Sequence, residues 1–217
     1  MCIRDSGKLV PFASSSIPLA TLGTFILWFG WFGFNGGSQL ALAGFENATA
    51  VATIYINTNL AACAGVMTCA VITRLINGKT DVIMMLNGAL GGLVAITAEP
   101  LTPTPLMAII IGSIGGIIVI LGTQALNKFQ IDDVVGAIPV HLFAGIWGTL
   151  AVPLTNSGTS FGPQLLGTAS ICAFVFVVSF IVWSIMKATI GIRISEEAEK
   201  EGTDIAETGV TAYAIRD

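Results

Sequence analysis

The sequence predicts an all-α polytopic membrane protein with about six transmembrane helices. Hydrophobic residues make up 54% of the 217 residues, charged residues only 10%, and the mean hydropathy is +0.86. Soluble domains carry about a quarter charged residues. The net charge of −4 comes without a basic patch, which excludes a nucleic-acid-binding protein. Disorder and an ordinary soluble domain are excluded by the high apolar content.

Six apolar runs supply the expected helices. A spanning helix needs about 20 apolar residues, and an isolated strand cannot satisfy its backbone groups in lipid. The third run lies between two acids, the fourth follows a proline cluster, and the fifth follows a pair of aspartates. The third and fifth are close to the lower length limit for spanning. The expected helices cover 17–34, 48–73, 82–98, 105–126, 134–153 and 164–190.

The chain divides into three parts by composition. Residues 1–8, MCIRDSGK, lack the basic start and apolar stretch of a signal peptide, and we interpret them as a junction or an artefactual start. Residues 9–190 form the predicted transmembrane domain. Residues 191–217 are polar and acidic and form a C-terminal tail. This tail is either a solvated segment or a cytoplasmic docking segment.

The nine Lys and Arg residues predict the orientation. All of them lie before the first helix, in the loops after the second and fourth helices, or from the end of the sixth helix onward. The three remaining loops, 35–47, 99–104 and 154–163, contain none. Cationic loops stay cytoplasmic, so both termini are expected in the cytoplasm.

Small residues recur one turn apart in three of the runs. Such G-x-x-x-G pairs let two helix backbones approach closely. Cysteines add no site, because no C-x-x-C pair is present. We expect no catalytic residue, metal or cofactor. The glycine pairs are Gly33 with Gly37, Gly88 with Gly92, and Gly112 with Gly116.

His141, the sole histidine, lies midway through the fifth expected helix. An ionisable residue inside a membrane is costly and usually faces a bundle interior or a cavity. Ala144 and Gly148 follow at helical spacing, a pattern that fits either a narrow lumen or a tight helix crossing. Pro139 should weaken the helix just before His141.

An aromatic cluster lies near the non-cytoplasmic end of the first helix. Trp31, Phe34 and Ser38 fall at i, i+3 and i+7 and share one face. Aromatic faces attract small cations, and a hydroxyl adds an acceptor. An aromatic belt at the membrane surface explains the same residues equally well.

Acidic residues mark two helix starts. Asp132 and Asp133 enter the fifth helix, where acids are stabilised by the helix dipole. In the tail, Ser195 is expected to cap a short helix that begins with Glu196 and Glu197. Position 198 is Ala, so a reciprocal capping box is missing.

Three segments together resemble the ammonium transporter family, which includes the Rh proteins. They are GTFILWFGWFGFNGGS at 23–38, DDVVGAIPVHLFAGIWGTL at 132–150 and GIRISEEAEKEGTDI at 191–205. The resemblance implies helices six to eleven of an eleven-helix fold, which are the second inverted repeat plus the terminal helix. It therefore implies a fragment that supplies one half of a pore. Thr208–Gly209 stands where many members carry His–Gly.

The resemblance also implies roles for four residues. His141 matches one of two pore histidines, and Phe34 matches one of two stacked phenylalanines that gate the outer mouth. Trp31 matches the tryptophan below that gate, and Ser38 matches the hydroxyl that recruits ammonium. The partner histidine and phenylalanine belong to the first repeat.

The implied function is an ammonium or ammonia channel or transporter subunit with a histidine relay, not an enzyme. The implied setting is the plasma (inner) membrane, with the lipid bilayer as surroundings and a homotrimer in full-length form. A cytoplasmic regulatory protein is the implied partner of the tail, and no nucleic acid is involved. Two alternatives stay open: an ammonium sensor that signals through its tail, and a related small-gas channel.

Overall fold

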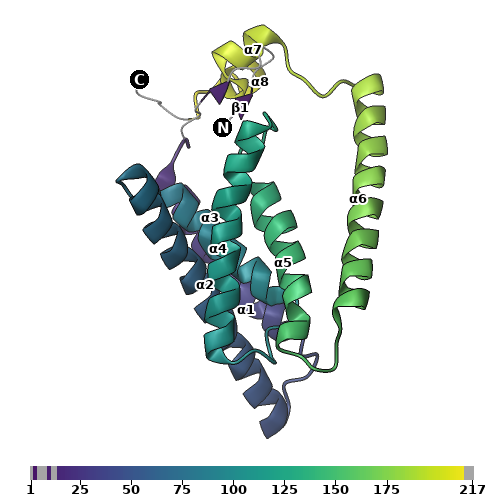
Figure 1. Cartoon of the computed structure of the whole chain (residues 1–217). Helices are drawn as coiled ribbons and strands as arrows, with labels where there is room; N and C mark the ends of the chain where they lie inside the picture. The colour runs from purple at the N-terminus through teal and green to yellow at the C-terminus, as the bar shows by residue number, and fades with distance from the viewer. Residues whose placement is uncertain (1, 4–8, 11–13, 213–217) are drawn as a thin grey trace. The chain divides into compact units, whose positions relative to one another are not determined.

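The structure is a computed structural model of the chain that describes residues 2–3, 9–10 and 14–212 (Figure 1). The chain divides into two compact units, 1–166 and 167–217. Each is described by itself. The main helices are α1 (Ile17–Gly37), α2 (Phe45–Asn77), α3 (Val82–Thr97), α4 (Pro105–Lys128), a π-helix η1 (Ile138–Phe143), α5 (Ala144–Ala151), the 3₁₀ turn η2 (Val152–Leu154) and α6 (Phe161–Thr189).

The described residues contain six apolar helical segments, as the sequence predicts. Four of them, α1, α2, α4 and α6, are long and apolar enough to cross a membrane. The segments 82–97 and 138–154 are shorter apolar helices, as expected from their length. Within the part of the chain that the structure describes, the one departure from an all-helical fold is a pair of two-residue antiparallel strands, β1 (Cys2–Ile3) and β2 (Leu9–Val10). Residues 1 and 4–8 of the expected junction lie outside the described residues.

Local signals set most helix starts. Ser16, Asp81 and Thr104 cap α1, α3 and α4, each accepting a backbone N–H three residues later. Such caps satisfy amides that have no partner within the helix. Gly78, with φ of 70°, ends α2, because glycine adopts this left-handed conformation without strain.

The fifth helix begins later than expected. We predicted it from residue 134, but helical structure starts at Ile138. Gly136 has φ of 79°, which an α-helix does not allow. The first six residues then form a π-helix that contains Pro139. The helix thus departs from α-helical hydrogen bonding at Pro139, and a weakening of the helix there stays a prediction.

Close backbone contacts hold α2, α3 and α4 together. A Cβ atom on Gly92 of α3 or Gly112 of α4 would collide with the carbonyl oxygen of Ala61 in α2. One on Gly88 would lie 2.6 Å from the carbonyl oxygen of Gly65. Two of the three predicted glycine pairs are thus helix crossings. The third is not, because a Cβ on Gly33 or Gly37 meets nothing within 4 Å.

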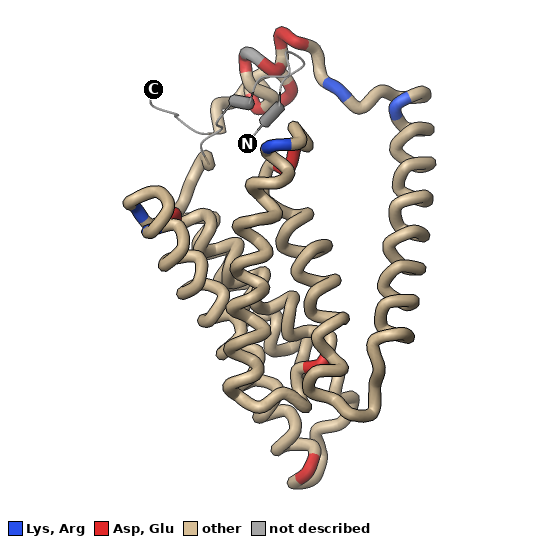
Figure 2. The backbone as a smooth tube through the Cα atoms, viewed as in Figure 1, with Lys and Arg blue, Asp and Glu red and all other residues tan. Residues whose placement is uncertain are grey.

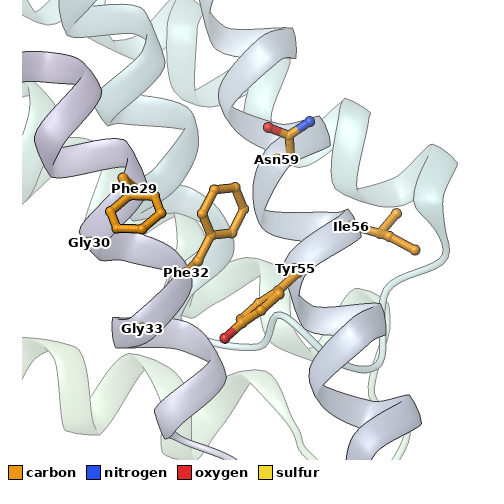
Figure 3. Close-up of a pocket in the computed structure, with 7 residues that line it drawn as sticks. All are labelled: Phe29, Gly30, Phe32, Gly33, Tyr55, Ile56 and Asn59. Atoms are coloured by element: carbon orange, nitrogen blue, oxygen red, sulfur yellow. The ribbon is translucent and has the colours of Figure 1, made fainter. Parts of the chain in front are cut away.

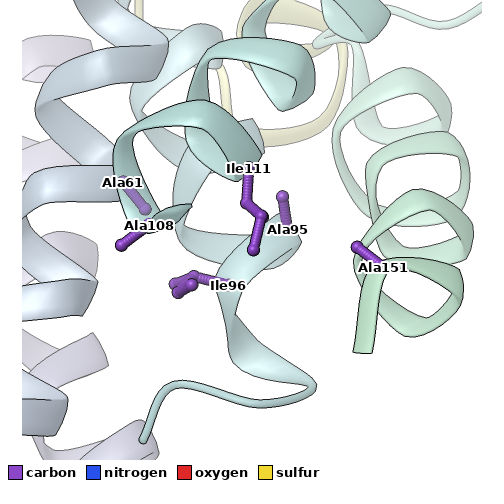
Figure 4. Close-up of a cluster of buried hydrophobic side chains, with 6 residues drawn as sticks. All are labelled: Ala61, Ala95, Ile96, Ala108, Ile111 and Ala151. Carbon is purple, nitrogen blue, oxygen red and sulfur yellow. The ribbon is translucent and has the colours of Figure 1, made fainter. Parts of the chain in front are cut away.

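The hydrophobic core lies where α2, α3, α4 and α5 meet (Figure 4). Small side chains dominate it, so the helices approach closely. Trp147 packs against the cluster and its indole N–H donates to the carbonyl of Ile111 at 3.1 Å. α3 is central, because it contacts α1, α2, α4, η1 and α5. The core residues are Ala61, Ala95, Ile96, Ala108, Ile111 and Ala151.

Cations of the first unit gather at one end. Arg74, Lys79 and Lys128 lie at or just after the carboxyl ends of α2 and α4, and Figure 2 shows blue only at that end of this unit. Acidic residues lie at both ends. This distribution among the described residues matches the charge pattern on which the predicted orientation depends.

The second unit contains most of α6, followed by α7 (Glu196–Glu201) and α8 (Thr203–Thr208). Ser195 caps α7 as predicted: its hydroxyl oxygen accepts the N–H of Ala198 at 3.2 Å. Arg193 forms an ion pair with Glu199 at 3.4 Å. The tail is therefore folded into short helices over its described part.

Candidate functional site

His141 lies on the exposed face of the π-helix. Its neighbours Pro139, Val140 and Ala144 are buried, whereas His141 and Leu142 are exposed. A π-helix bonds each amide to the carbonyl five residues back, and such turns occur frequently at functional sites. The structure therefore places one imidazole on an otherwise apolar surface.

The small residues after His141 form a helix crossing. Ala144 is fully buried, and a Cβ on Gly148 would collide with the backbone of Ala95 in α3. The sequence left two interpretations of these small residues open, a narrow lumen or a tight helix crossing. The structure shows the crossing. The π turn changes the angular spacing of the side chains, so Ala144 does not share the exposed face of His141.

Trp31 and Phe34 contact each other on α1. Their ring centroids are 5.7 Å apart with the planes tilted by 50°, a favourable geometry for an aromatic pair. Trp31 is half-buried, and its indole N–H donates to the Thr97 hydroxyl of α3 at 2.7 Å. Phe34 is 65% exposed.

Asn35 explains why Phe34 points outward. The Asn35 side chain is buried and donates to the Thr58 hydroxyl of α2 at 3.0 Å. Adjacent residues of a helix project in different directions, so fixing Asn35 against α2 turns Phe34 away from it.

Ser38 caps the carboxyl end of α1. Its hydroxyl donates to the Phe34 carbonyl at 3.2 Å, and the residue is exposed. The hydroxyl proton is used locally, which leaves the oxygen lone pairs as acceptors. Ser38 therefore bonds the Phe34 backbone one turn earlier on α1.

α3 connects the aromatic pair to the histidine helix. Its Thr97 binds Trp31, while its Ala95 packs against Gly148. Three of the predicted site residues thus form one group on α1. His141 lies on η1, which also packs against α3.

A groove between α1 and α2 lies elsewhere (Figure 3). It has a volume of about 650 Å³, and Asn59 supplies an amide in a mostly apolar lining. None of the four predicted site residues lines it. The lining residues are Phe29, Gly30, Phe32, Gly33, Tyr55, Ile56 and Asn59.

Sequence reasoning missed Thr97 and underestimated Asp133. Thr97 follows an apolar run, and nothing in the sequence pairs it with a tryptophan 66 residues earlier. Asp133 was interpreted as a general dipole effect, but its carboxylate makes three defined contacts with the start of η1. The described residues contain no group of three or more His, Cys, Asp or Glu that could hold a metal ion.

Comparison with known protein families gives one match over nearly the whole chain. A family model described as Ammonium Transporter Family matches residues 4–213. The ammonium transporter Amt2 of Archaeoglobus fulgidus is 43% identical over 91% of this chain and 46% of its own length. A putative ammonium transporter of Synechocystis is 39% identical over 97% of this chain and 49% of its own length. The chain thus spans about half the length of these curated relatives.

Solved structures also match this chain over about half of their own length. A structure titled Sensor Amt Protein matches with a TM-score of 0.85 and 33% identity, covering 94% of this chain and 52% of that one. Mep2 from Candida albicans matches with a TM-score of 0.73 and 28% identity, covering 89% of this chain and 46% of that one.

Proposed function

The chain belongs to the ammonium transporter family, and on that premise we propose that it forms one wall of a pathway for ammonium or ammonia across a membrane. The observation that carries this proposal is the exposed imidazole of His141 on a helix whose other side is packed. An ionisable group within an apolar membrane segment is costly unless it faces a pathway or the bundle interior.

The aromatic group on α1 supports an entry site. Ammonium is a small cation, and the faces of Trp31 and Phe34 attract cations. The Ser38 oxygen offers an acceptor beside them. A hydrophobic passage beyond this point disfavours the charged form, so nitrogen crosses as ammonia. Neutral His141 then accepts and donates hydrogen bonds along the passage. No covalent step is needed, and the proposed role is transport rather than catalysis.

The proposal includes a setting and partners. The membrane is the plasma (inner) membrane, the cationic end of the first unit faces the cytoplasm, and both ends of this segment are cytoplasmic. The complete assembly is a homotrimer, in which a further segment supplies the opposite wall of each pathway. A cytoplasmic regulatory protein docks on the tail helices α7 and α8.

A flux measurement tests the function. Residues 17–217 replace the matching segment of the Archaeoglobus fulgidus Amt2, and this chimera is reconstituted into liposomes. An internal pH dye reports ammonia entry after addition of ammonium. We expect saturable flux above that of protein-free liposomes. A folded chimera with no flux above that background contradicts the proposal.

A sensor is the second candidate, favoured by the match to a structure titled Sensor Amt Protein. A sensor binds ammonium at the aromatic entry and passes the signal to its tail. It predicts that the chimera binds ammonium without saturable flux. It also predicts that ammonium changes the amide spectrum of the tail, which the transport proposal does not require.

A further inference from the structure

The loop before the π-helix is tied to the carboxylate of Asp133. Oδ1 accepts the N–H groups of Gly136 and Ala137 at 3.0 and 2.9 Å, and Oδ2 accepts that of Ile138 at 2.8 Å. The first amides of a helix have no partner within it. One side chain therefore satisfies the first amide of η1 and the two amides before it, and fixes the residue at which the helix begins.

Asn87 of α3 holds the same loop from another element. It is buried, and its Nδ2 donates to the Val135 carbonyl at 3.0 Å. A Cβ on Gly136 would lie only 2.6 Å from that Nδ2 atom. The path of residues 133–138 is thus set both by its own aspartate and by an amide fixed in α3.

The packed side of the π-helix leaves little room for adjustment. A Cβ on Gly122 of α4 would lie 2.7 Å from Phe143 and 3.0 Å from Pro139. Pro139 has no N–H to donate. The rotation of this six-residue helix therefore depends on where it begins, and the rotation decides the direction of His141.

We propose that Asp133, with Asn87 as its counterpart, is a positioning residue that sets the direction of the His141 imidazole. Its effect on transport rests on the proposed function, whereas its effect on the imidazole does not. Asp132 carries the same charge one residue earlier. Substituting Asp132 therefore distinguishes the defined contacts of Asp133 from a general effect of negative charge.

The imidazole can be observed directly. His141 is the sole histidine of the 217 residues, so ¹⁵N-histidine labelling of the untagged chain in detergent micelles reports this ring alone. We expect D133A to move or split the ring ¹⁵N signals. D133N, which keeps an acceptor oxygen, should give a smaller change, and D132A should match the wild type.

Two results would overturn the proposal. One is an unchanged ring spectrum in D133A with only a lower melting temperature, which indicates a purely structural cap. The other is an equal change in D132A, which indicates long-range charge. If D133A does not fold, G136A disturbs the same loop from the Asn87 side and is expected to move the ring signals as well; unchanged signals there count against the proposal.

Transport gives a second, separable readout in the chimera. Loss of a cap changes a local equilibrium about fivefold, so maximal flux per folded D133A protein should fall by up to about fivefold. The half-saturating ammonium concentration should stay unchanged, because the aromatic entry on α1 is untouched. If the wild-type chimera itself has no flux, the proposed function fails while the ring spectrum still decides the role of Asp133.

Discussion

The indole N–H of Trp31 in α1 donates to the hydroxyl of Thr97 in α3 at 2.7 Å. The Thr97 hydroxyl in turn donates to the Leu93 carbonyl at 2.7 Å. The orientation of the tryptophan ring is thus anchored in the central helix of the first unit. Because the ring also contacts Phe34, the proposed entry site depends on a side chain far away in the sequence.

Replacing Thr97 by valine tests this anchor. Thr97→Val keeps the shape but leaves the half-buried indole N–H without an acceptor, at a cost of about 1–3 kcal/mol. We expect a lower melting temperature and a higher half-saturating ammonium concentration in the chimera. Thr97→Ser should stay close to the wild type in both. Thr123→Val is the matched control, because the Thr123 hydroxyl binds only the Val119 carbonyl of its own helix. Equal effects of the two valine variants would contradict the anchor.

The glycine contacts predict opposite outcomes for two alanine variants. Gly92→Ala places a methyl group against the backbone of α2, and overpacking of this kind costs roughly 1–3 kcal/mol. Gly33→Ala meets open space and gains up to about 1 kcal/mol of helix propensity. Thermal melting in detergent should fall for the first variant and stay level or rise for the second. A similar change in both would show that the crossings are not specific.

The proposed orientation predicts the result of reporter fusions. Fusions after Ser157 should be external and those after Lys79 internal, because cations are absent from the loop at 154–163 and present in the loop after α2. A cytoplasmic result at Ser157 would reverse the orientation.

The tail has a pH-dependent contact. The pKa of Asp204 is lowered from its ordinary value of 3.8, first by the N–H of Ala212, which lies 2.8 Å from Oδ2, and then by that of Ile205. A lowered pKa means that the contact is stabilising above the ordinary value and is lost as pH falls through the lowered one. The amide ¹⁵N shift of Ala212 should titrate below pH 3.8. Asp204→Asn should abolish this step and Glu207→Gln should leave it; a step that persists in Asp204→Asn would assign it to another group.

Composition and hydropathy predicted the helices well, because each apolar run must be helical in lipid. The predicted start of the fifth helix was wrong. The positive φ of Gly136 and the contacts of Asp133 depend on tertiary packing against Asn87, which the sequence does not show. The π-helix also could not be read from spacing, since the same residues at α-helical spacing place Ala144 beside His141.

The site residues show a similar division. Trp31, Phe34 and Ser38 could be grouped because they share one helix face. The residues that hold this group in place could not be predicted, because Thr97 and Thr58 belong to other helices. Whether these residues conduct ammonium stays a prediction.

The most direct test of the central claim is ammonia flux through the chimera carrying His141→Leu, measured on the same preparation as its melting temperature. His141 is exposed in the first unit, so leucine should leave the melting temperature near that of the wild type. If His141 lines the pathway, saturable flux should disappear while the protein stays folded. Retained flux in a folded His141→Leu chimera, or a loss of flux only in proportion to a loss of folded protein, would contradict the account.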